Sequence, residues 1–343
     1  MFFVLVLHAN YLSIGAPELG QVSLAEYSIR HFIEVYTYIA VDVFILISGY
    51  FSIRPSLKSI SNLLFCCFFY SVGIRIVYSS YYLMIGEVAP KPFWESLLFL
   101  SNSVWFVVDY LMLVVFAPIL NAFIDNSSKR ISLLIVILMV IFSTYFGLLR
   151  RSLMEYVSGF SFVTFIMIYL IGRILYLYQG RIESHIKPLT AWGGHFLGTF
   201  LLFAVVLLAA HKGHHCYLEH LGRCEIFSYS NPLVILSAVS VFWLFVQKEF
   251  YSGKINKLAK STFAILLLHS NPVSVIIYNH YFSYVYGHFN FGLYLFIMLV
   301  SCVAVFFSSV LIDQIRIWGY DNYIKARVLS LECKVVKKFN EGI

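Results

Sequence analysis

Two titratable side chains near the beginning of the sequence are placed to activate a hydroxyl group. His8 lies in the first apolar stretch and Asp42 in the second. If these stretches are antiparallel neighbouring helices, both side chains lie roughly 10 Å below the same surface. A carboxylate beside an imidazole fixes its tautomer and stabilises its protonated form, as a general base requires. A purely structural hydrogen-bonded pair has the same spacing, so both interpretations remain open.

Other polar side chains also interrupt apolar stretches, where each needs a partner, a water-filled space or a function. Arg173 and His195 lie near the ends of their stretches, which favours structural or interfacial roles. For the deeper residues, structural and functional roles are equally open. The candidates for lining a cavity are Arg75, Trp105, Asp109 and His269.

The composition identifies the surroundings of these residues as a lipid bilayer. Of the 343 residues, 60% are hydrophobic and only 12% are charged, whereas a soluble domain carries about a quarter charged residues. This excludes an ordinary soluble enzyme, a disordered chain and a fibrous protein. The apolar runs are continuous and do not alternate with a period of two, which favours helices over a transmembrane barrel. We therefore expect an all-α, polytopic membrane protein.

Hydropathy predicts about ten membrane-spanning helices. They cover approximately residues 1–15, 35–53, 60–80, 96–123, 131–149, 157–179, 190–210, 231–247, 261–281 and 291–313. If the N-terminus is cytoplasmic, the inner loops and tail carry about 16 Lys and Arg residues, and the outer loops carry about six. The positive-inside rule therefore favours this orientation, and an even number of spans returns the C-terminus to the cytoplasm as well. Because the first stretch is short for a crossing, we expect either a native start upstream of Met1 or a tilted, partly interfacial helix.

The ends of the chain and one loop add three further expectations. Residues 1–315 are expected to form the transmembrane domain, and residues 316–343 are expected to form a basic cytoplasmic tail against anionic headgroups.

Cys216 and Cys224 both fall in one expected outer loop. If this side of the membrane is oxidising, a disulfide between them is a hypothesis. The histidines of that loop match zinc-site spacing only at His211 and His215, so we expect no metal site.

Four segments, in order along the chain, resemble the acyltransferase 3 family of integral-membrane acyltransferases. The first is an apolar run that reaches His8, and the second is the VDVFILISGYF segment at residues 41–51. The third runs from Trp105 through the APILN segment that ends at Asn121, and the fourth is STFAILLLH at residues 261–269. The resemblance covers nearly the whole chain.

The resemblance implies transfer of an acyl group, usually acetyl from cytoplasmic acetyl-CoA, to a hydroxyl of a cell-envelope carbohydrate. The first-span histidine of the family corresponds to His8. The phosphates of an acyl-CoA need cationic partners on the cytoplasmic face, and Arg54 and Lys58 are the basic pair nearest to the second span. Many members have an R-x-x-R motif there, whereas this chain has Arg54-Pro-Ser-Leu-Lys58.

The sequence therefore predicts a multi-pass O-acetyltransferase of the inner (plasma) membrane, with His8 as general base and Asp42 as its orienting partner. Its expected partners are acyl-CoA as donor substrate, a carbohydrate acceptor and the bilayer, and no nucleic acid is expected. We expect no further cofactor, because the thioester of the donor is already activated. The alternatives are a transporter or flippase for a lipid-linked glycan and a polysaccharide polymerase. Transporters often show interrupted helices in paired half-repeats, and a polymerase is expected to carry a larger outer loop; neither feature is evident.

Overall fold

The computed structural model describes residues 1–87, 105–146, 159–211, 226–248 and 251–341. Within these residues the chain is helical throughout, apart from turns and one isolated bridge between Leu19 and Val22. The all-α prediction is confirmed for this part of the chain. The elements that carry the argument below are α1 (Phe2–Leu7), the π-helical turn η1 (His8–Leu12), α2 (Leu24–Thr37), α3 (Ala40–Phe51), α4 (Leu57–Met84), α5 (Trp105–Asn126) and α6 (Lys129–Thr144). They continue with α7 (Phe162–His185), α8 (Pro188–His211), α9 (Pro232–Val246), α10 (Gly253–Ala259), α11 (Thr262–Ser270), α12 (Ser274–His288), α13 (Phe291–Gly319), the π-helical turn η6 (Tyr320–Ile324) and α14 (Lys325–Glu341).

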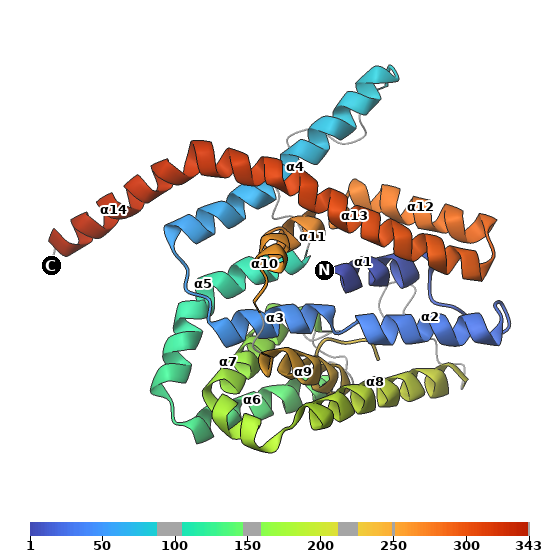
Figure 1. Ribbon diagram of the computed structural model, residues 1–343, viewed down its shortest axis with the longest axis horizontal. Coiled ribbons are helices and arrows are strands. Elements are labelled where there is room, and N and C mark those ends of the chain that lie inside the picture. Colours follow the sequence, from blue (N-terminus) through green and yellow to red (C-terminus); the bar gives the residue numbers. More distant parts are fainter. Residues whose placement is uncertain (88–104, 147–158, 212–225, 249–250, 342–343) are drawn as a thin grey trace.

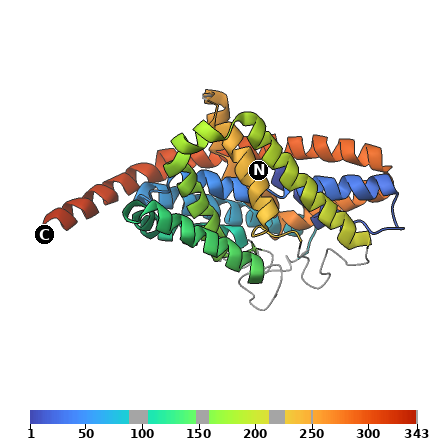
Figure 2. The ribbon, with the colours of Figure 1, turned by 90° about the horizontal axis from the view of Figure 1, so that it is seen from below.

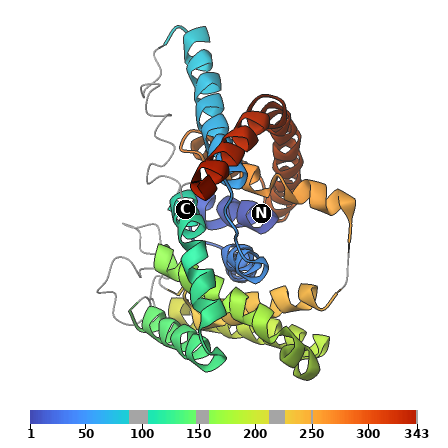
Figure 3. The same cartoon turned by 90° about the vertical axis from the view of Figure 1, so that its left-hand side faces the viewer.

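The short helix α1 lies between two longer elements, α13 on one side and the α2–α3 pair on the other (Figure 1). The helices α7, α8 and α9 pack on the far side of α2 and α3. Figures 1 and 3 both show α4 extending beyond the other helices, and Figures 1 and 2 show α14 projecting from the bundle at the C-terminal end. The N-terminal helix is therefore an interior element of the bundle.

Close approach of α3 and α7 depends on two glycines. A Cβ atom at Gly49 would overlap the backbone carbonyl of Tyr169, and one at Gly172 would lie 2.5 Å from the carbonyl oxygen of Leu46. Real Cβ atoms do not approach backbone atoms so closely, so any larger residue must push the two helices apart. Small residues that allow close backbone approach are a common feature of helix interfaces in membranes.

Among the described residues, six helices are long and apolar enough to cross a membrane, and a seventh results if one bent pair counts as a single span. The six are Leu24–Phe51, Leu57–Met84, Trp105–Asn126, Phe162–His185, Pro188–Ala209 and Phe291–Lys334. The apolar helices Phe2–Leu12 and Pro232–Val246 are shorter. The described residues thus support a multi-span membrane protein but do not confirm the expected count of about ten.

The stretch expected as one span over residues 261–281 is broken instead. Helix α11 ends at Ser270 and α12 begins at Ser274, and the helical stretch Gly253–Ser270 is bent by 75° relative to Ser274–His288. Pro272 explains the break, because proline has no N–H to donate and disfavours helical geometry at the residue before it. Asn271 is accordingly extended, with ψ 141°, and its side chain accepts a hydrogen bond from Val273 N at 3.0 Å.

Helix α2 begins earlier than the second expected span, which started at residue 35. Its first residue is Leu24, preceded by Ser23, whose hydroxyl accepts a hydrogen bond from Glu26 N. The intervening turns contain charged residues that lower the hydropathy, among them Arg30, which the charge count had placed in an outer loop. Arg30 is only 2% exposed, so this polar part of the helix belongs to the interior of the bundle.

The expected domain boundary after residue 315 falls inside α13. Arg316 forms a two-pronged ion pair with Asp313, with contacts of 2.6 and 3.0 Å, and donates to Asn62 of α4 at 2.8 Å. Tyr70 of α4 also donates to Asp313, at 2.9 Å. These buried contacts bind the end of α13 to α4. The position of the basic tail against lipid headgroups stays a prediction.

Candidate active site

His8 and His269 form a hydrogen-bonded pair inside the bundle. The distance from His8 Nδ1 to His269 Nε2 is 3.1 Å, and the two ring centroids lie 5.0 Å apart. His8 is the first residue of the π-helical turn η1, and His269 is the next-to-last residue of α11, directly before the break. Both histidines therefore lie where a helix departs from regular α geometry, and π-helical turns are frequent at functional sites.

The partners of the two rings determine which nitrogen carries each proton. His269 Nδ1 lies 2.7 Å from the carbonyl oxygen of Ile265, which only accepts, so this nitrogen is the protonated one in the neutral ring. His269 Nε2 is then an acceptor, and it receives bonds from the Ser270 hydroxyl at 3.1 Å and from His8 Nδ1. His8 consequently carries its proton on Nδ1, which leaves a lone pair on Nε2.

The accessibility of the two rings differs in a way that suits this arrangement. His269 is only 3% exposed, whereas His8 is half-buried and retains accessible surface. Within the described part of the chain, His8 Nε2 makes no hydrogen bond. An unprotonated imidazole nitrogen is what a general base needs, and the tautomer that provides it is set here by a second side chain, as in catalytic triads.

The expected hydrogen bond between His8 and Asp42 is wrong. Asp42 is fully buried, and neither of its carboxylate oxygens has a hydrogen-bond partner among the residues that the structure describes. The depth estimate failed because the α2–α3 pair begins at Leu24, which places Asp42 about 18 residues, or roughly 27 Å, along it. The ring of His8 instead contacts His269 of α11.

The remaining expected cavity residues are not hydrogen-bonded to the histidine pair in the part of the chain that the structure describes. Arg75 is 5% exposed, and its Nε and Nη2 atoms find no hydrogen-bond partner among the described residues, although its guanidinium lies 5.3 Å from the ring centroid of Tyr78. Asp109 is partly buried on α5. Trp105 packs against an aromatic cluster that includes Phe160 and stacks on the ring of Tyr229. Within the described residues, none of the three is hydrogen-bonded to His8 or His269, so cavity lining stays a prediction for them.

Two polar residues expected to be structural have partners that fit such a role. Arg173 forms an ion pair with Asp125 of α5 at 3.2 Å. His195 Nδ1 lies 2.7 Å from the hydroxyl oxygen of Ser237, which connects α8 and α9. These contacts account for both residues as links between neighbouring helices.

The residues expected to bind the acyl donor lie on an exposed segment between α3 and α4. Arg54 is in the connection itself, and Lys58 is in the first turn of α4; both are exposed. They are thus accessible to a ligand, and their role stays a prediction.

Two expectations concern the loop after α8. The hypothetical disulfide between Cys216 and Cys224 lies outside the described residues, as does His215 of the histidine tract. His211 is the last residue of α8.

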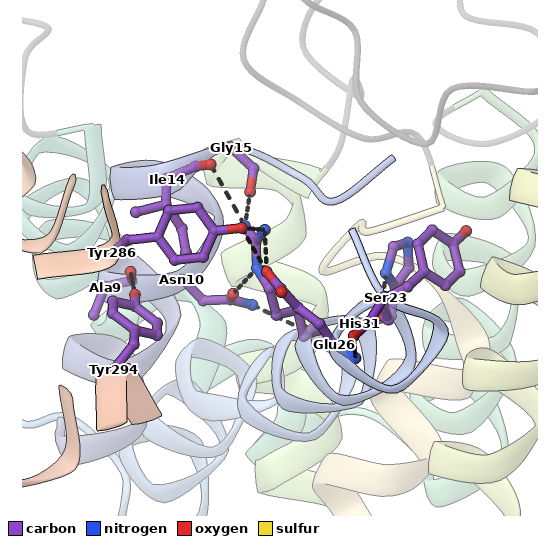
Figure 4. Close-up of polar contacts among 11 residues, drawn as sticks. Ala9, Asn10, Ile14, Gly15, Ser23, Glu26, His31, Tyr286 and Tyr294 are labelled. Atoms are coloured by element: carbon purple, nitrogen blue, oxygen red, sulfur yellow. Dashed lines mark hydrogen bonds and ion pairs between the residues drawn. The ribbon is translucent and has the colours of Figure 1, made fainter. Parts of the chain in front are cut away.

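Sequence reasoning missed a second buried polar cluster, which connects α2 to η1 and α12 (Figure 4). Its members on α2 are Glu26, Arg30 and Glu34, and Asn10 and Tyr286 complete it. The three α2 residues recur every four positions, and this spacing places them on one face of a helix. That periodicity was the available signal, because three charged residues on one face of a helix beside a bilayer need partners inside the protein.

A comparison with protein families identifies the chain. A family model described as an acyltransferase domain, Acyl_transf_3, matches residues 1–313. The chain belongs to the acyltransferase 3 family. The resemblance found in the four sequence segments is confirmed. No curated protein and no solved structure matches the chain in the corresponding searches.

Membership in the acyltransferase 3 family gives the histidine pair a chemical context. The family match supports a membrane acyltransferase that acts on an acyl substrate and an acceptor in a lipid bilayer. Acyl transfer to a hydroxyl needs a group that removes the hydroxyl proton, and an imidazole is the side chain most often used for this. The free nitrogen of His8, with a tautomer fixed by His269, fits that requirement.

Proposed function

We propose that this member of the acyltransferase 3 family transfers an acetyl group from acetyl-CoA to a hydroxyl group of a cell-envelope carbohydrate, with His8 as the general base. The observation that carries the proposal is the hydrogen bond from His8 Nδ1 to His269 Nε2, because it leaves the lone pair of His8 on Nε2. His269 takes the orienting role that the sequence had assigned to Asp42. It is a positioning residue, since it acts through His8.

The reaction follows from these two rings. His8 Nε2 removes the proton of the acceptor hydroxyl while the hydroxyl oxygen attacks the thioester carbonyl. The carbon–sulfur bond then breaks as the carbonyl re-forms, and His8 returns the proton to the departing thiolate. General-base assistance of this kind contributes on the order of 100-fold to 10,000-fold in rate. Throughout, Ile265 holds the proton of His269 on Nδ1, so that His269 Nε2 continues to accept from His8.

The donor is proposed to bind where the chain crosses from α3 to α4. Arg54 and Lys58 are exposed basic residues there, and both side chains suit the phosphates of coenzyme A. In the orientation predicted from the positive-inside rule, this connection lies in the cytoplasm, where acetyl-CoA is available. The acceptor carbohydrate then approaches His8 from the opposite side of the membrane.

The broken pair α11 and α12 favours one second candidate, a transporter or flippase for a lipid-linked glycan. Discontinuous helices near the middle of the membrane commonly form transporter binding sites, and the sequence had shown no such interruption. Labelled-acetyl transfer separates the two functions.

Two assays test the proposal. In the first, the purified protein in lipid nanodiscs is incubated with radiolabelled acetyl-CoA and envelope polysaccharide. In the second, the O-acetyl content of envelope glycans is compared in cells with and without the gene. We expect label on the carbohydrate and loss of O-acetyl groups without the gene. Carbohydrate that stays unlabelled, together with unchanged O-acetyl content, contradicts the proposal.

A further inference from the structure

The polar cluster missed by sequence reasoning lies directly beside the turn that begins with His8. Arg30 and Glu34 of α2 are 2% and 4% exposed, respectively, so these two ionisable side chains lie inside the protein. Figure 4 shows Asn10, Glu26 and Tyr286 converging on the same region between α2 and the C-terminal helices. Burying such groups in a membrane-spanning bundle is costly, and residues that carry this cost usually serve a function.

Asn10 uses both ends of its side-chain amide to bind α2. Its Nδ2 atom donates to the carbonyl oxygen of Arg30 and to Glu34 Oε2, both at 2.9 Å. Its Oδ1 atom accepts from Arg30 Nε at 3.3 Å. With both amide hydrogens and the oxygen engaged, the side chain of Asn10 has one preferred orientation, and the backbone of η1 is fixed with it.

Arg30 also holds the far end of the same turn. Its Nη2 atom donates to the carbonyl oxygens of Ile14, at 3.5 Å, and of Gly15. Gly15 has φ +73°, a conformation that ends the helix. The guanidinium is held in turn by Tyr286, whose hydroxyl accepts from Nη1 at 3.5 Å and donates to Glu26 at 2.5 Å. One buried arginine therefore satisfies carbonyls that the end of the helix leaves without partners.

Two further bonds act on the backbone next to His8. The Ser13 hydroxyl donates to the carbonyl oxygen of His8 at 2.7 Å, and the Tyr294 hydroxyl donates to that of Ala9 at 2.7 Å. A π-helical turn is an uncommon backbone conformation, so contacts from outside the turn are needed to hold it. The direction in which His8 points depends on this turn because His8 is its first residue.

We propose that Asn10, Arg30 and Glu34 are positioning residues that hold the η1 turn and thereby aim His8 Nε2 at the acceptor hydroxyl. The inference rests on the proposed role of His8 as general base. In the described part of the chain, none of the three is hydrogen-bonded to either ring of the histidine pair. Their effect is exerted through the backbone of η1, which distinguishes them from His269, whose ring bonds directly to His8.

The test compares four variants of the full-length protein in nanodiscs with labelled acetyl-CoA as donor. Asn10→Ala removes all three hydrogen bonds to α2, and Glu34→Ala removes one. Glu34→Gln keeps an oxygen that accepts from Asn10 but removes the charge. The matched control is Thr37→Val on the same helix, because, among the described residues, the hydroxyl of Thr37 bonds only to carbonyls of α2 itself. For each variant, kcat and KM for acetyl-CoA are measured per folded molecule.

We expect Asn10→Ala to lower kcat about 10- to 100-fold, since a displaced catalytic group costs this much, while KM for acetyl-CoA changes less than about twofold. Glu34→Gln should retain most of the activity that Glu34→Ala loses, and Thr37→Val should behave like the wild type. Wild-type kcat in Asn10→Ala overturns the proposal, as does an equal loss in Thr37→Val or an equal loss in the two Glu34 variants.

A spectroscopic measurement tests the positioning role without any turnover. In protein labelled with ¹⁵N-histidine, the His8 ring should show a protonated Nδ1 and an unprotonated Nε2. We expect Asn10→Ala to replace this signal by a mixture of tautomers, whereas Thr37→Val preserves it. An unchanged His8 signal in Asn10→Ala overturns the positioning role. Absence of acetyl transfer by the wild-type protein, with the expected NMR change, would instead contradict only the proposed function.

Discussion

Replacement of His269 by alanine removes the acceptor that keeps the proton of His8 on Nδ1. The bond lost is the 3.1 Å contact between the two rings, and its acceptor is 97% buried, as the 3% exposure of His269 indicates. Leaving the Nδ1–H donor of half-buried His8 without its partner costs up to about 1 to 3 kcal/mol, the range for a buried donor. Because each 1.36 kcal/mol corresponds to a tenfold change in rate, kcat should fall about 5- to 150-fold if this cost appears in the transition state.

The assay is transfer of labelled acetyl from acetyl-CoA to polysaccharide by protein in nanodiscs, with kcat and KM determined separately. His269→Gln provides an intermediate case, since its amide oxygen can accept from His8 Nδ1, and it should lose less activity than His269→Ala. The matched control is His288→Ala, which replaces an exposed histidine of α12. Wild-type kcat in folded His269→Ala protein would refute the assignment of His269 as the residue that orients His8.

Three other predictions follow from the same contacts. Asp42→Asn should change kcat less than about threefold, because the Asp42 oxygens make no hydrogen bond to His8 or to any other described residue. Steady-state kinetics measure this, and a loss comparable to that of His269→Ala would contradict it. Gly49→Ala and Gly172→Ala should each destabilise the protein by about 1 to 3 kcal/mol through overpacking between α3 and α7. Gly73→Ala should not, because a Cβ there meets no neighbouring atom within 4 Å. Thermal unfolding in detergent compares the three variants, and equal unfolding temperatures would refute the packing argument. The double variant Arg54→Ala/Lys58→Ala should raise KM for acetyl-CoA about tenfold with little change in kcat, and an unchanged KM would exclude this pair from donor binding.

The class of the fold could be predicted from composition because a bilayer imposes a simple constraint. Continuous apolar runs with few charges form helices that satisfy their own backbone hydrogen bonds, and the described residues confirm an all-α chain with several helices long enough to span a membrane. Hydropathy failed where polar residues are paired inside the bundle. It began the second span at residue 35 because Glu26, Arg30 and Glu34 lowered the average, although α2 begins at Leu24.

The candidate site was predictable in its members but not in its pairing. His8 and His269 were both identified as titratable residues within apolar stretches, since such residues are rare there. Their contact joins residues 261 positions apart, and no spacing within one segment encodes it. The expectation for Asp42 depended on helix boundaries, and an error in one boundary shifted the calculated depth. The break at Pro272 had a local signal in the proline itself, and it places His269 at the end of a helix.

The most direct test of the central claim, that His8 is the base of an acyl transfer, is the rate of labelled-acetyl transfer by His8→Ala and His288→Ala proteins in nanodiscs. Both variants must first show wild-type insertion and unfolding temperature. We predict that His8→Ala loses on the order of 100-fold to 10,000-fold in kcat, as expected when a general base is removed, and that His288→Ala retains wild-type activity. Stably inserted His8→Ala protein that transfers acetyl at the wild-type rate would contradict the claim.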